Sequence, residues 1–161
     1  MSPTIDTNAA AEAELETLHT EAESRITTYS YARQQGESAK SRVSLARTDL
    51  VNAVVQIVKK DGGENNLHYH TAIDTFWMVL KGRVRFYGPG DELIGEFGPM
   101  EGTVTPRYSR YWFENAGDEE LELLQVAGST RAKDAAPMGG RTDVAPQRFK
   151  VNSSDRFSAE R

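Results

Sequence analysis

The chain has 161 residues, of which 38% are hydrophobic and 27% are charged, as in one soluble globular domain with a short extension. No apolar run reaches the roughly 20 residues that cross a bilayer, and the lack of cysteine excludes disulfides and thiolate metal sites. The formal charge is -5, and residues 1–30 carry six of the 24 acidic residues but one of the 19 basic residues. The remainder is neutral and has no basic face to offset phosphate charge. These features predict a cytoplasmic protein that binds neither nucleic acid nor membrane.

The first element in chain order is a helix predicted over residues 8–29. Leu15, Leu18, Ala22 and Ile26 recur at helical spacing. The apolar stripe is narrow, so we expect this helix to lie against the rest of the protein or against a second subunit. Residues 33–44 are polar and are interpreted as a linker.

A β pattern follows the linker. Short strands separated by turn sequences are predicted at residues 51–58, 67–70, 75–80, 83–87, 93–97, 102–105, 111–114 and 121–126. Closely spaced strands without intervening helices predict an all-β sandwich or barrel. We therefore divide the chain into a helix and linker (1–45), a barrel (46–130) and a Gly- and Pro-rich surface tail (131–161).

The chemistry of the chain is expected at His68 and His70. Alternate residues of a strand share a face, so both imidazoles point the same way and Tyr69 points the opposite way. Two neutral imidazoles so placed can bind Fe, Zn, Ni, Mn or Cu. The alternative is two half-buried histidines whose nitrogens are satisfied by hydrogen bonds.

The residues around this pair resemble the conserved motifs of the cupin superfamily. Gly62, His68, His70 and the run 76–82 resemble the first motif. The residues that resemble the second motif are Gly98, Pro99, Pro106, Tyr111 and Asn115. The similarity covers about residues 50–126 and is that of a small single-domain cupin of the type-2 group. It implies a double-stranded β-barrel (a jelly roll) with an N-terminal helical extension, commonly a homodimer, and a site inside one mouth of the barrel.

Cupins typically bind metal through two histidines and a glutamate of the first motif and a histidine of the second. His68 and His70 match, but Thr75 stands at the glutamate position, after Asp74, and Tyr111 replaces the second-motif histidine. Three readings stay open. A divalent transition metal could be held by His68 and His70 and completed by Tyr111 or Asp74. Without metal, a histidine could act as acid or base with Tyr111 as proton donor. The pocket could also only bind a ligand.

Five further residues are candidates for contact with the substrate. Trp77 and Phe113 share the inward parity of Thr75 and Tyr111, which suits core packing or an aromatic wall. Gln56, Arg85 and Gln125 are polar strand residues that are either solvated or orient a carbonyl or carboxylate. The sequence thus predicts an enzyme for a small organic substrate, with isomerase, cyclase, lyase and dioxygenase chemistry all open, or a non-enzymatic ligand-binding cupin.

Overall fold

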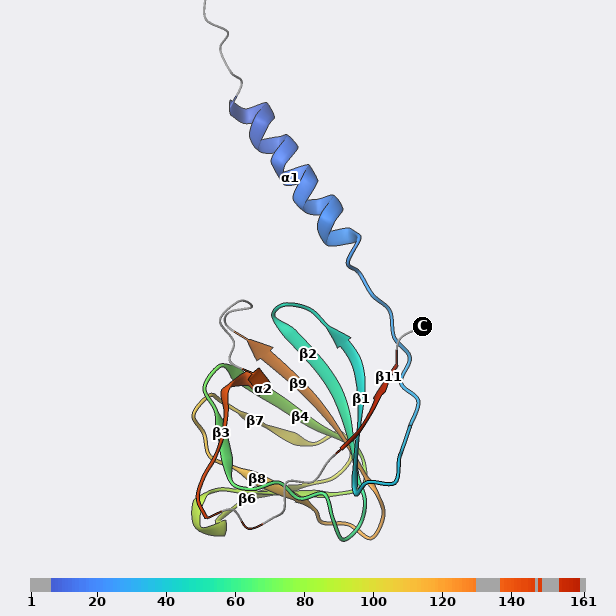
Figure 1. Ribbon diagram of the computed structural model, residues 1–161, viewed down its shortest axis with the longest axis vertical. Helices are drawn as coiled ribbons and strands as arrows, with labels where there is room; N and C mark the ends of the chain where they lie inside the picture. Colours follow the sequence, from blue (N-terminus) through green and yellow to red (C-terminus); the bar gives the residue numbers. More distant parts are fainter. Residues whose placement is uncertain (1–6, 130–136, 147, 149–153, 160–161) are drawn as a thin grey trace, which may run out of the picture.

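The computed structural model describes residues 7–129, 137–146, 148 and 154–159. Helix α1 (Thr7–Glu23) projects away from the β-structure, and every side chain described on it is exposed (Figure 1). Of the two alternatives for this helix, packing on the barrel is not what the structure shows, and packing against a second subunit stays a prediction. The helix also ends before residue 29, because Arg25 and Ile26 bond to carbonyls only three residues back, which tightens the last turn. Among the described residues, no helix has the length and hydropathy needed to span a bilayer.

Two sheets enclose the core, and the larger has six strands in the order β11-β1-β2-β9-β4-β7. Its strands are β1 (Lys40–Arg47), β2 (Val51–Val58), β4 (Ile73–Lys81), β7 (Gly102–Thr105), β9 (Leu121–Ser129) and β11 (Asp155–Ser158). The smaller sheet joins two groups through a bridge between His68 and Tyr111. These groups are β6 (Leu93–Phe97), β5 (Val84–Tyr87) and β8 (Trp112–Asn115), and β3 (His68–His70) with β10 (Arg141–Asp143). Two short helices, η1 (Pro89–Asp91) and α2 (Pro137–Gly140), complete the described elements.

Apolar residues fill two separate clusters. One lies between the sheets and is built around Trp77, Phe86 and Phe113. The other lies on the opposite face of β1 and β2, where Val43 and Val55 are fully buried and residues of the N- and C-terminal segments pack on them. Because successive side chains of a strand point to opposite faces, Lys40, Arg42 and Ser44 of β1, which alternate with Val43 and Leu45, face the barrel interior.

The eight predicted strands are all present, with ends that agree to within three residues. Strands β1, β10 and β11 were not predicted. Strand β1 begins at Lys40, inside the segment interpreted as a linker, and the tail contributes both β10 and β11. Strands β10 and β11 have three and four residues, and such short strands form where a partner edge is available, so their local sequence carries little signal. The barrel therefore includes residues on both sides of the expected span.

Edge strand β7 provides a test of the sheet geometry. A Cβ on Gly102 would lie 1.9 Å from the carbonyl oxygen of Trp77, on the partner strand β4. Backbone atoms cannot rotate away, so we expect Gly102→Ala to lower the free energy of unfolding in urea by about 1–3 kcal/mol. The matched control is Gly128→Ala in β9, where an added Cβ meets nothing within 4 Å. Its effect should stay within about 0.5 kcal/mol, and equal losses in both variants would contradict the clash.

Candidate functional site

Three rings singled out from the sequence meet inside the barrel. The ring centroid of His68 lies 5.1 Å from that of His70 and 4.5 Å from that of Tyr111. His68 and Tyr111 exchange two backbone hydrogen bonds, of 3.1 and 3.0 Å, so they are directly opposite residues and their side chains share a face. Both side chains are buried. The structure thus brings the two motifs together at this point.

The backbone sets the protonation state of His68. Its Nδ1 lies 2.7 Å from the carbonyl oxygen of Asn66. A carbonyl can only accept, so Nδ1 carries the proton and donates it, and Nε2 holds the lone pair. Burial, followed by the positive charge of Arg141, lowers the pKa of His68 to about 3. At neutral pH this imidazole is therefore an uncharged proton acceptor.

Tyr111 has the opposite role. Burial raises the pKa of Tyr111 to about 12, and a hydrogen bond with the Thr105 side chain and the charge of Arg141 act in the other direction. The phenol therefore stays protonated and can donate. Trp77 fixes Thr105 by donating from its indole nitrogen to the threonine hydroxyl at 3.0 Å. The rings of Trp77 and Phe113, 5.5 Å apart, pack beside this group as an aromatic wall.

Three basic side chains that the sequence analysis did not single out surround the rings. Lys40 and Arg42 lie on the inward face of β1, and the Lys40 ammonium nitrogen lies 5.0 Å from the centroid of the Phe113 ring. Arg141 on β10 is directly opposite His70 on β3. Burial, followed by the charges of Arg42 and Arg141, lowers the pKa of Lys40 to about 7. The interior of the barrel is therefore cationic on one side.

Glycines in the tail bring Arg141 into this position. Gly139 and Gly140, directly before it, both have positive φ, which glycine adopts without steric cost. A Cβ on Gly140 would lie 2.0 Å from the Thr71 hydroxyl oxygen, and one on Gly139 would lie 2.7 Å from Ile73. Only a chain without side chains here can pass so close to the start of β4. The Gly-Gly-Arg sequence was the available signal for this residue.

Two glutamines predicted as substrate contacts also face the interior. Gln56 on β2 is directly opposite Arg42 on β1. The Gln56 amide nitrogen donates to the Gln125 side-chain oxygen at 2.7 Å, and Arg42 donates to the same oxygen at 3.3 Å. The three side chains form one connected polar network next to the rings.

Two other predicted residues lie on the outer surface. Arg85 donates to the Glu96 carboxylate at 2.6 Å, and its side chain is 41% exposed. Asp74 accepts from the backbone nitrogen of Arg107 at 2.8 Å and is 52% exposed. Asp74 has the opposite parity to the inward Thr75, so it does not join the histidines. The structure places neither Arg85 nor Asp74 with the ring cluster.

The donor set fits a divalent metal poorly. Among the described residues, no three or more His, Cys, Asp or Glu side chains are grouped to hold a metal ion. Asp143 on β10 is opposite His68, but its carboxylate already accepts a hydrogen bond from Arg141 at 2.8 Å and so is engaged by a cationic side chain. The donors at the site are two imidazoles and a neutral phenol, and the adjacent side chains of Lys40, Arg42 and Arg141 repel a cation. This chemistry suits an anion better.

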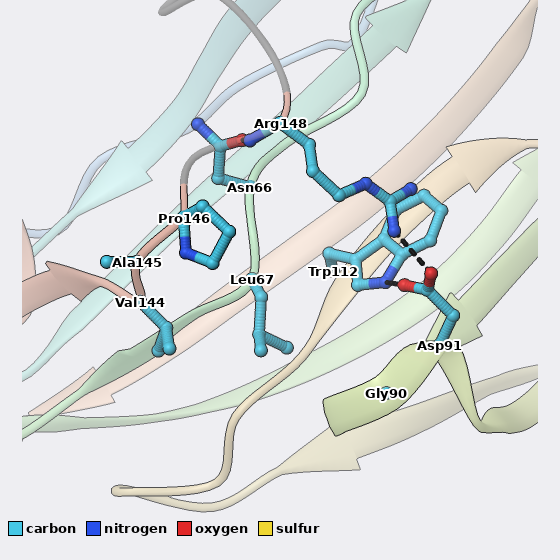
Figure 2. Close-up of a pocket in the computed structure, with 9 residues that line it drawn as sticks. All are labelled: Asn66, Leu67, Gly90, Asp91, Trp112, Val144, Ala145, Pro146 and Arg148. Carbon is cyan, nitrogen blue, oxygen red and sulfur yellow. Dashed lines mark hydrogen bonds and ion pairs between the residues drawn. The ribbon is translucent and has the colours of Figure 1, made fainter.

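A pocket of about 220 Å³ lies on the other side of β8. Figure 2 shows its lining residues: Asn66, Leu67, Gly90, Asp91, Trp112, Val144, Ala145, Pro146 and Arg148. The polar groups in it are directed at one another, because the Trp112 indole donates to Asp91 at 3.0 Å and Arg148 forms an ion pair with the same carboxylate. Trp112 has the opposite parity to Tyr111, so this pocket is separate from the ring cluster.

Comparisons with known proteins identify the fold. No family model and no curated protein match the chain. An uncharacterized Klebsiella pneumoniae protein with a double-stranded beta-helix domain superposes with a TM-score of 0.59 and 19% identity, over 77% of this chain and 94% of that chain. KdgF from Halomonas sp. gives a TM-score of 0.56 and 18% identity, over 66% of this chain and 96% of that chain.

An RmlC-like cupin from Methanocaldococcus jannaschii also superposes, with a TM-score of 0.53 and 16% identity, over 65% of this chain and 91% of that chain. The chain therefore has the double-stranded β-helix fold of the cupins, with an N-terminal helix added to it. This confirms the fold expected from the two motifs.

Proposed function

We propose that this chain is a small-molecule enzyme in which His68 and Tyr111 perform proton transfer without a metal. The observation that supports it most is the contact between a neutral, buried imidazole and a neutral, buried phenol. The Asn66 carbonyl fixes the imidazole, so Nε2 is the nitrogen that carries the lone pair and can accept a proton. One acceptor and one donor side by side are the elements of general acid–base catalysis.

The reaction class follows from these two groups. His68 Nε2 takes a proton from a carbon next to a carbonyl group, and the electron pair moves onto the carbonyl oxygen. Tyr111 donates a hydrogen bond to that oxygen and stabilises its developing charge. Return of the proton to the same or the neighbouring carbon makes an isomerase, and loss of a leaving group makes a lyase. A negative charge on the substrate would raise the pKa of His68 and make it a stronger base.

The test is hydrogen exchange in D2O, followed by NMR on a panel of small neutral and anionic carbonyl compounds. The protein is prepared without a histidine tag and treated with a chelator. We expect deuterium incorporation in at least one compound, and about a 100-fold slower rate for Tyr111→Phe. The matched control is Tyr69→Phe, because Tyr69 lies on the other face of β3 and stacks on Tyr108 at 6.5 Å. Its rate should equal that of the unmodified protein.

Two results would overturn this function. Exchange that requires added Fe, Zn, Ni, Mn or Cu would restore the metal-dependent alternative, in which the Asn66 carbonyl orients His68 as a ligand. Binding without exchange would make the chain a ligand-binding cupin. A homodimer in the cytoplasm, expected from the resemblance and the composition, belongs to the same proposal, and size-exclusion chromatography tests the dimer.

A further inference from the structure

Beside the ring cluster, one buried polar atom is left without a partner. Gln56 is 3% exposed, and its side-chain oxygen makes no hydrogen bond with any residue that the structure describes. Rotating the amide does not remedy this. Arg42 donates to the Gln125 oxygen, which fixes the orientation of Gln125, and that same oxygen requires the Gln56 nitrogen to face it. The Gln56 oxygen is therefore an acceptor held inside the barrel.

The charges around this acceptor are also incompletely balanced. In the described part of the chain, neither Lys40 nor Arg42 forms an ion pair with a carboxylate, and Arg141 pairs with Asp143. Glu64 acts on Lys40 only from a distance, as the smallest influence on its pKa. Buried cations that no carboxylate neutralises are unfavourable for folding. Their presence here favours an anionic group as the missing partner.

The two features lie next to each other. Arg42 and Gln56 are directly opposite residues of β1 and β2, so their Cβ atoms are about 5 Å apart. The Gln125 oxygen accepts hydrogen bonds from both side chains, so the Arg42 guanidinium and the Gln56 amide lie close together. A ligand that satisfies both therefore carries its negative charge close to its hydrogen-bond donor. The guanidinium groups of Arg42 and Arg141 match the planar, two-oxygen geometry of a carboxylate.

From this geometry we infer that the site binds a small carboxylate with a hydroxyl or amino group on the adjacent carbon. The carboxylate lies between Arg42 and Arg141 near Lys40, and the hydroxyl or amino group donates to the Gln56 oxygen. This names the substrate class of the site described above and so rests on the proposed function for its catalytic meaning. Binding itself is independent of that function.

Three probes of similar size separate the two interactions in calorimetric titrations. Lactate has both groups, propanoate lacks the hydroxyl, and lactamide lacks the charge. We expect lactate to bind at least tenfold more tightly than either of the others. Arg42→Gln and Arg141→Gln should each weaken lactate and propanoate about tenfold or more, whereas Gln56→Met should weaken lactate to the level of propanoate and leave propanoate unchanged.

Arg83→Gln is the control, because Arg83 pairs with Glu96 on the outer surface. This variant should bind all three probes as the unmodified protein does. Circular dichroism shows that each variant is folded. Lactamide binding as tightly as lactate, unchanged lactate affinity in both arginine variants, or tighter binding of inorganic phosphate than of lactate would overturn the inference. Lactate binding without hydrogen exchange would overturn only the proposed function, and exchange confined to neutral carbonyl compounds would overturn only this inference.

Discussion

Phe86→Ala is expected to lower the free energy of unfolding by about 3–5 kcal/mol, the largest loss that a single substitution should cause here. Phe86 on β5 is fully buried. Its ring centroid lies 5.3 to 6.2 Å from those of four other rings, which belong to Trp77, Phe97, Tyr111 and Phe113. Truncation removes the apolar contacts and leaves a cavity that the rigid barrel cannot close. Urea unfolding followed by tryptophan fluorescence measures the loss.

Phe76→Ala is the matched control for this substitution. Phe76 is on β4 but points outward and is 46% exposed. Its truncation therefore removes less buried apolar surface than truncation of Phe86 and leaves no enclosed cavity. We expect a loss below about 1 kcal/mol. Similar losses in the two variants would show that the rings between the sheets are not the core of the fold.

Acid should destabilise the protein through His68. Its pKa is about 3 in the folded chain, because burial disfavours the charged form, and 6.5 is its ordinary value. The unfolded chain therefore binds the proton first as the pH falls below about 6.5. The stability from the neutral imidazole is complete above that pH and is lost towards about pH 3. The slope reaches about 1.4 kcal/mol per pH unit, and the whole effect is on the order of 5 kcal/mol.

Urea unfolding between pH 6.5 and pH 5 tests this dependence before most carboxylates titrate. The free energy of unfolding should fall more steeply for the unmodified protein than for His68→Asn, by about 1 kcal/mol per pH unit. His19→Asn is the control, because His19 is exposed on helix α1 and should follow the unmodified protein. Identical slopes for His68→Asn and the unmodified protein would refute a buried neutral His68.

The strands and the two histidines were predictable because their signals are local. Turn sequences between the strands set elements such as β6 (Leu93–Phe97) and β7 (Gly102–Thr105) to the residue. The spacing of His68 and His70 gave their shared face, and the motif order gave Tyr111 as their partner. Parity alone also placed Trp77 and Phe113 on that side.

The cationic half of the site was not predictable in the same way. In β1, Lys40 and Arg42 alternate with Val43 and Leu45, which normally indicates a solvated face and a buried face. Here the apolar face packs under the terminal segments, on the outside of the barrel, and the basic face points inward. Arg85, which carries the same local pattern in β5, faces solvent instead.

The sequence by itself determined which residues of each strand share a face, since the period of two is a property of the extended backbone. It also determined the paired imidazoles and the absence of thiolate ligands. Only the tertiary structure decided which face of β1 is inside, and which tail residue meets His70. Both depend on pairing between segments far apart in the chain, where the energy comes from packing and hydrogen bonds that no local pattern encodes.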